Sequence, residues 1–304
     1  MMPLLFVAVF LGASFVMIWR LEAMAKDGME GTVLGTLIMP YCTGMGNLIF
    51  AWLMGAKGGS GDDVLVNCLV NNVTNLTLLV GLPIAVWGMR RGPEMDRRAV
   101  LITLGAALVF TGAAWVLMAA GAVGFSGGAI MVALFVAWQG RHVVAAARSK
   151  AGRGARYAAL LAVDFAILLA GSYALYLSTD WLAGWVSNIH MGFISARHLG
   201  WLSGWLDVLP NAALAFYYGW KRRPEVVYAS QIGDGHICIP LCLGIFALQR
   251  PGALRPCFQA GVIILVAAIL VHLLFMGFGG RLPRLAAWAL VAAYGLFLWA
   301  GLPK

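Results

Sequence analysis

Ten long apolar runs, separated by short charged gaps, restrict how this chain can fold more than any other feature. They lie at about 3–19, 31–54, 64–88, 99–119, 124–140, 157–177, 193–219, 225–248, 256–278 and 284–301. A helix needs roughly 20 apolar residues to cross a bilayer, and most of the runs reach that length. Only 11% of the 304 residues are charged, against about 25% in a soluble domain. The sequence therefore predicts an all-α polytopic membrane protein with about ten transmembrane helices.

The basic residues fall unequally on the two sides of these runs. When the gaps are numbered alternately, 16 of the 21 Lys and Arg residues lie on one side and 5 on the other. Cytoplasmic loops of membrane proteins are the ones enriched in Lys and Arg. The split predicts a plasma-membrane protein with both termini outside and the 141–156 loop in the cytoplasm. Because the net charge of +9 lies between spans, it indicates a membrane surface and not nucleic acid as the partner.

Two stretches of the chain, 33–81 and 194–244, resemble each other. Each contains an apolar helix interrupted by Gly or Pro, a short charged loop, and a second apolar helix with scattered polar residues. The letters correspond weakly but in order, with Asn47 paired to Asn211, Ala51 to Ala215, Gly55 to Gly219, Leu78 to Leu241 and Gly81 to Gly244. Two broken hydrophobic segments in corresponding halves point to a transporter whose site lies near the bilayer midplane.

The repeat also predicts how the chain is divided. Residues 1–140 form a first five-helix repeat, 141–156 a basic cytoplasmic linker, and 157–304 a second five-helix repeat. Five is an odd number of spans, so the second repeat enters the membrane from the opposite side. The two repeats are therefore expected to be inverted relative to each other.

In the first half, the second span is expected to break between Thr43 and Gly46, because two glycines there loosen the helix. Lipid cannot satisfy the backbone groups that a break frees, so it must face protein or a water-filled cavity. Asn47 follows directly. The alternative is that these glycines only allow close helix packing.

The third span carries Asn67, Asn71 and Asn75 at the spacing i, i+4, i+8, which places them on one helical stripe. Asn71 and Asn75 are the candidates we single out for a cation or water path. Hydrogen bonding between helices is the alternative role.

In the second half, Asp207 precedes an expected break at Pro210, and Asp234 lies between two glycines in the eighth span. Burying unpaired carboxylates costs several kcal/mol each, and a bound cation or shared protons would offset that cost. The alternative is a structural pair with each other or with His236. Asp164, in the sixth span, is either functional or paired with a neighbouring helix.

At these two stretches the sequence resembles the cation/calcium exchanger superfamily, which includes sodium/calcium and calcium/proton exchangers. The family's repeat pattern is Gly-Thr-Ser-x-Pro-Glu, then Gly-Asn-x-x-Gly-Ser-Asn-x-x-Asn or Asp. Its glutamate falls at Asn47 and Asn211 here, its serine at Asn71 and Asp234, and its threonine at Asp207. The resemblance implies ten spans in two inverted repeats.

It also implies a cation site with Asp207 and Asp234 as the metal-binding carboxylates. The ligands that complete the shell are expected to be Asn47, Asn211, Asn71, Asn75 and Thr43.

The expected function is cation antiport by alternating access, with the first and sixth spans moving around the midplane site. Calcium or sodium is the expected cargo, protons are a further candidate, and no resident cofactor or enzymatic activity is expected. The expected partners are the lipid bilayer and small inorganic cations; the sequence does not define an oligomeric state.

One alternative is a degenerate exchanger that is inactive or moves another ion or solute, because both family glutamates are replaced. A second is an intramembrane aspartyl protease, against which Gln231 replaces the first glycine of that family's motif.

Overall fold

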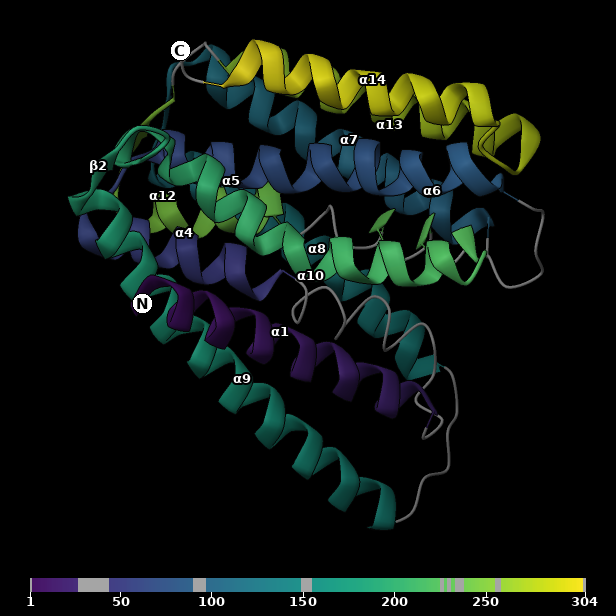
Figure 1. Cartoon of the computed structure of the whole chain (residues 1–304), viewed down its shortest axis with the longest axis horizontal. Coiled ribbons are helices and arrows are strands. Elements are labelled where there is room, and N and C mark those ends of the chain that lie inside the picture. Colours follow the sequence, from purple (N-terminus) through teal and green to yellow (C-terminus); the bar gives the residue numbers. More distant parts are fainter. Residues whose placement is uncertain are drawn as a thin grey trace.

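The computed structural model describes residues 2–26, 44–89, 97–148, 155–224, 227–228, 231–232, 238–254 and 258–302. These residues are almost entirely helical (Figure 1). The helices are α1 (Met2–Lys26), α4 (Met45–Lys57), α5 (Gly61–Thr74), α6 (Val80–Trp87), α7 (Arg97–Ala119), α8 (Phe125–Arg148), α9 (Ala155–Asn188), α10 (Leu199–Trp220), α12 (Leu243–Gln249), α13 (Gln259–Gly279) and α14 (Arg284–Gly301). Within the described part of the chain, six helical segments are long and apolar enough to cross a membrane. The predicted all-α polytopic fold is confirmed.

Two short two-stranded pairings join the ends of helices. The strands β1 (Ala122–Val123) and β4 (Gly252–Ala253) pair antiparallel and so connect a loop of the first half to a loop of the second. The strands β2 (His190–Met191) and β3 (Ile194–Ser195) form a hairpin between α9 and α10.

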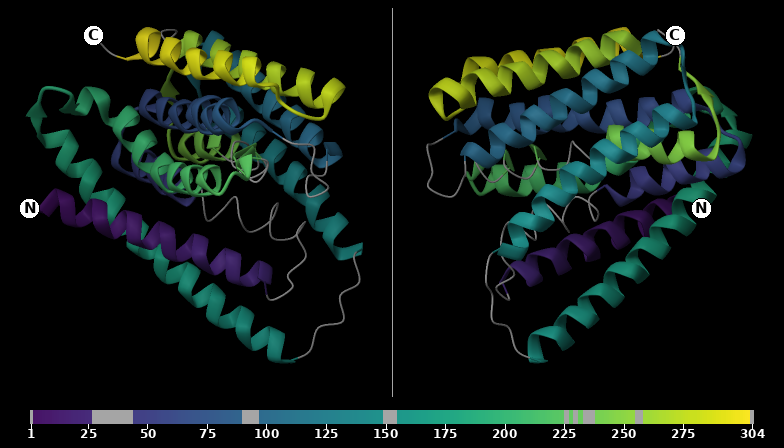
Figure 2. Two further views of the ribbon diagram at one scale, coloured as in Figure 1. Left: turned by 45° about the vertical axis from the view of Figure 1, so that its right-hand side comes forward. Right: turned by 180° about the vertical axis from the view of Figure 1, so that it is seen from behind.

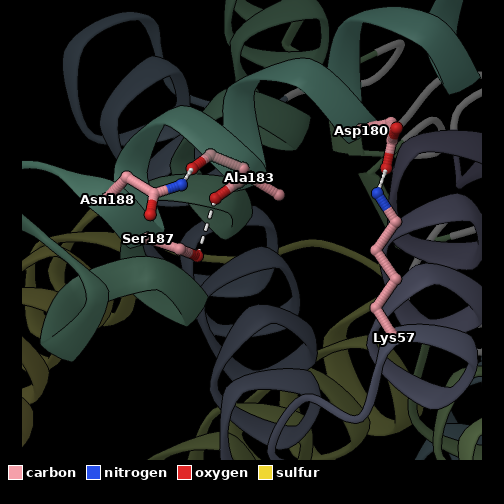
Figure 3. Close-up of polar contacts among 6 residues, drawn as sticks. Lys57, Asp180, Ala183, Ser187 and Asn188 are labelled. Atoms are coloured by element: carbon pink, nitrogen blue, oxygen red, sulfur yellow. Dashed lines mark hydrogen bonds and ion pairs between the residues drawn. The ribbon is translucent and has the colours of Figure 1, made fainter.

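The helix α9 is longer than the apolar run that predicts it. The run ends at residue 177 because Ser178, Thr179 and Asp180 follow, yet the helix continues to Asn188. Polar side chains in this part are accommodated by bonds to the helix itself: the Ser178 hydroxyl donates to the Ala174 carbonyl at 2.8 Å. In the last turn, Ser187 and Asn188 donate to the carbonyls four residues earlier (Figure 3).

When each helix is replaced by its equivalent in the other half, the main helix contacts of one kind become those of the other. The helix α5 packs on α10 and α4 packs on α12; likewise α6 packs on α14 and α12 packs on α8. The remaining large contacts, α7 with α13 and α1 with α9, each join equivalent helices of the two halves. This pattern is what two repeats related by a pseudo-twofold axis produce.

Two π-helical turns lie at equivalent places in the repeats. The turn η2 (Asn75–Leu79) joins α5 to α6, and η4 (Cys238–Cys242) precedes α12. Gly81 and Gly244 are separated along the chain by the same number of residues as the first residues of the two turns, Asn75 and Cys238. Each glycine permits a close helix crossing: a Cβ at Gly81 would lie 2.9 Å from a carbonyl oxygen of α14, and one at Gly244 would lie 3.1 Å from a carbonyl oxygen of α8. The structure therefore supports the repeat register expected from the sequence.

The helices α1 and α9, which we call the peripheral pair, pack against each other at one side of the molecule (Figures 1 and 2). Arg20 of α1 forms an ion pair with Asp164 of α9, whose side chain is only 2% exposed. Of the two roles expected for Asp164, the structure therefore supports pairing with a neighbouring helix. A second ion pair, between Lys57 and Asp180, ties α9 to the end of α4 (Figure 3).

The expected break at Pro210 is not present, because α10 continues from Leu199 to Trp220 with Pro210 inside it. A proline removes one backbone donor and need not end a helix when packing holds both sides. That packing is close: a Cβ at Gly200 would lie 2.6 Å from the Asp63 carbonyl oxygen, and one at Gly204 would lie 3.0 Å from the Asn67 carbonyl oxygen. In the first half, α4 begins at Met45 after a bend at Gly44, and Thr43 lies outside the described residues.

Candidate cation site

Asp207 lies where helices of both halves meet. Its side chain is buried, and its Oδ2 accepts a hydrogen bond of 2.9 Å from Nδ2 of Asn67 on α5. The same Asn67 nitrogen lies 3.1 Å from the Ser203 hydroxyl oxygen, one turn before Asp207 on α10. On the third side, Gly46 of α4 faces the carboxylate so closely that a Cβ there would clash with Oδ1 and lie 3.0 Å from Cγ. The donor supplied by Asn67 is a neutral amide.

Several buried amide oxygens in this part of the core have no hydrogen-bond donor among the described residues. Asn47, Asn67 and Asn71 are fully buried, and within the described residues their side-chain oxygens accept no hydrogen bond. The Asn47 nitrogen also has no acceptor there. A buried polar group left unsatisfied costs about 1–3 kcal/mol, so such groups are rare unless something binds them. Neutral amide oxygens are hard ligands suited to Na⁺ or Ca²⁺.

The other predicted ligands are distributed as follows. Asn211 is buried on α10 one turn after Asp207, and Asn75 is buried as the first residue of η2. Asn71 donates to the Cys238 sulfur at 3.0 Å and so contacts the second π turn. Thr43 and Asp234 lie outside the described residues, so their roles as ligands stay predictions.

Asn67 is the residue that sequence reasoning passed over. It belongs to the same i, i+4, i+8 stripe as Asn71 and Asn75, and the stripe was the signal that could have identified it. Its contact with Asp207 joins residues 140 positions apart, which no local pattern reveals. Within the described ranges, no group of three His, Cys, Asp or Glu side chains could hold a metal ion.

Helices from two inverted halves meet at a buried carboxylate and at amide oxygens that no described group satisfies, which is the arrangement of a membrane transporter of ions. A sequence model of the sodium/calcium exchanger protein family matches residues 1–139 and 163–302, and the chain belongs to this family. The resemblance inferred from the repeat motifs is thereby confirmed. Members of this family are transporters, so the protease alternative is not favoured.

Solved structures show the same fold. The sodium-calcium exchanger NCX_Mj, soaked with Na⁺ and Sr²⁺, superposes with a TM-score of 0.71 at 16% identity, covering 99% of this chain and 97% of that one. The H⁺/Ca²⁺ exchanger CAX superposes with a TM-score of 0.74 at 16% identity, covering 99% of this chain and 81% of that one. Comparison of the sequence with curated proteins found no match.

Proposed function

We propose that this integral membrane protein is a cation antiporter that works by alternating access around Asp207. Both structural relatives named above are described as exchangers of Ca²⁺, one against Na⁺ and one against H⁺. Calcium and sodium are accordingly the proposed cargo, with protons as a further candidate. The carboxylates proposed to bind the cation are Asp207 and Asp234.

The observation that carries this proposal is the environment of Asp207. The carboxylate is 5% exposed, it accepts a hydrogen bond from the neutral amide of Asn67, and it lies beside amide oxygens that no described group satisfies. Removing a carboxylate from water costs several kcal/mol, and each unsatisfied amide adds to that cost. A bound cation offsets both costs at once, because it neutralises the carboxylate and accepts the amide oxygens as ligands.

The peripheral pair is the proposed moving part. Between it and the rest of the molecule lies a cavity of about 180 Å³, lined almost entirely by apolar side chains such as Phe50, Leu182 and Leu206. Sliding along such a surface breaks few polar contacts. Ser203 lines the same cavity and also contacts Asn67, so a shift at this interface reaches the carboxylate through one side chain.

We further infer that the protein lies in the plasma membrane with the 141–156 loop in the cytoplasm and both termini outside. The support is the 16-to-5 division of Lys and Arg. Labelling of single cysteines introduced at each loop with a membrane-impermeant maleimide tests the orientation. Labelling of the 141–156 loop in intact cells would contradict it.

Uptake of labelled Ca²⁺ or Na⁺ into proteoliposomes, driven by an opposing Na⁺ or H⁺ gradient, tests the function. We expect Asp207→Asn to abolish gradient-driven uptake, because the isosteric amide removes the charge that holds the cation. Asp180→Asn makes the same chemical change outside the site and is expected to retain uptake within a few-fold. Equal uptake by the parent protein and Asp207→Asn would remove Asp207 from the mechanism.

A further inference from the structure

We infer that His272 is a positioning residue for the cation site. Together with Tyr228, it holds the π turn η2, and with it Asn75, in one arrangement. The equivalent turn η4 of the second half accepts a contact from a weaker donor, the Cys68 thiol. This inference rests on the proposed function, because its consequence is a firmly held position for Asn75, one of the proposed ligands.

The hydrogen bonds around His272 determine which ring nitrogen carries the proton. Nε2 lies 2.8 Å from the carbonyl oxygen of Leu76, and a carbonyl oxygen can only accept. Nε2 therefore carries the hydrogen, and Nδ1 is left as an acceptor. The Tyr228 hydroxyl lies 3.1 Å from Nδ1 and donates to it. Both ring nitrogens of this fully buried histidine are thus satisfied, and neither can rotate away without losing a bond.

The bond to Leu76 restrains the π turn from another helix. A π turn departs from the regular i→i−4 ladder and closes i→i−5 bonds instead. The imidazole N–H of His272 adds a bond from α13 to a carbonyl inside that turn. Leu76 follows Asn75 directly, and both lie in η2. The imidazole therefore restrains the backbone turn from which the Asn75 amide projects.

The second π turn has a different donor. The first carbonyl of η4, that of Cys238, accepts a contact of 3.1 Å from the Cys68 sulfur. A thiol is a weak hydrogen-bond donor, whereas the imidazole N–H is a full-strength one. The thiol contact to η4 is therefore weaker than the imidazole bond to η2. Asn71 also contacts η4, through the Cys238 sulfur.

Four variants test this inference by two readouts. His272→Leu removes the bond to Leu76, whereas His272→Gln keeps an amide nitrogen that reaches the same carbonyl. Cys68→Ala is the matched control at the equivalent turn. Tyr228→Phe leaves the bond to Leu76 in place but removes the donor to Nδ1. Hydrogen exchange of the peptide covering 75–81 reports on the turn itself, and the KM and maximal rate of cation uptake report on the site.

For His272→Leu we expect faster exchange at 75–81 and a KM raised roughly threefold to tenfold, as expected for loss of one buried hydrogen bond. The maximal rate per folded transporter should change less than KM. His272→Gln should restore both readouts to near the parent values, and Cys68→Ala should leave exchange at 75–81 unchanged. If His272→Leu does not fold, Tyr228→Phe must still raise exchange at 75–81.

Unchanged exchange at 75–81 in both His272→Leu and Tyr228→Phe would overturn the inference. So would equal increases at that peptide in His272→Leu and Cys68→Ala. A parent protein that shows no cation uptake would instead contradict the proposed function, since the exchange readout does not depend on transport.

Discussion

Adding a single methyl group at Gly46 should displace the Asp207 carboxylate of the candidate site. It lies in the first turn of α4, facing the carboxylate of Asp207 on α10. In Gly46→Ala, the new Cβ would clash with Oδ1 and lie 3.0 Å from Cγ, several tenths of an ångström inside ordinary contact. A Cβ would also lie 3.2 Å from the ring of Phe10. The carboxylate must therefore move away from α4, and its 2.9 Å bond from Asn67 must lengthen or break.

The magnitude follows from three opposing effects. A hydrogen bond to a charged group contributes about 1.5–3 kcal/mol, and overpacking costs about 1–3 kcal/mol when nothing else yields. Alanine in a helix gains about 0.5–1 kcal/mol over glycine. The two costs less the helix gain leave an expected net loss of about 2–5 kcal/mol in the free energy of unfolding. Because the carboxylate itself is displaced, we expect cation affinity to fall by about tenfold.

The assay is a cation titration of thermal unfolding in detergent, together with the KM of uptake in proteoliposomes. Gly12→Ala is the matched control, because it lies in α1 with no atom within 4 Å of the new Cβ. The control should be as stable as the parent or slightly more so, with unchanged affinity. An unchanged cation affinity in folded Gly46→Ala would show that the position of Asp207 does not determine binding, and the reasoning would fail.

The remaining predictions concern stability. Lys57→Met should change the free energy of unfolding by less than about 1 kcal/mol, because its ion pair with Asp180 has side chains 56% and 33% exposed (Figure 3). Arg20→Met should cost about 3–5 kcal/mol, because Asp164 is only 2% exposed and loses its partner. Equal shifts in melting temperature for these two variants would contradict the distinction. Gly244→Ala places a Cβ 2.6 Å from a valine methyl of α8 and should lower the free energy of unfolding by about 1–3 kcal/mol. An unchanged melting temperature would show that these helices do not pack closely.

Much of the architecture follows from the sequence because the bilayer acts locally on each segment. Lipid leaves helices as the way for an apolar run to satisfy its backbone, so run length and position predict the spans directly. The repeat register is readable for a related reason. Gly81 and Gly244 occupy equivalent close crossings, and equivalent crossings in an inverted repeat demand the same small residue.

The candidate site could be predicted only as a set of polar residues within apolar runs. Asn71, Asn75 and Asp207 were identifiable because polar groups in apolar spans are costly and therefore few. That Asn67 is the residue bonded to Asp207 depends on how α5 rotates against α10, which hydropathy does not encode. The continuity of α10 through Pro210 has the same origin, since packing on α5 outweighs one missing hydrogen bond.

The sequence alone determined that the chain crosses the membrane as helices, in two corresponding halves, with a few carboxylates and amides within its apolar runs. The tertiary structure decided the partners: Asp164 with Arg20, Asp207 with Asn67, and His272 with Leu76 and Tyr228. The physical reason is one of range. Insertion depends on the free energy of each segment in lipid, whereas these hydrogen bonds and ion pairs join residues from 44 to 196 positions apart and form only once helices have packed.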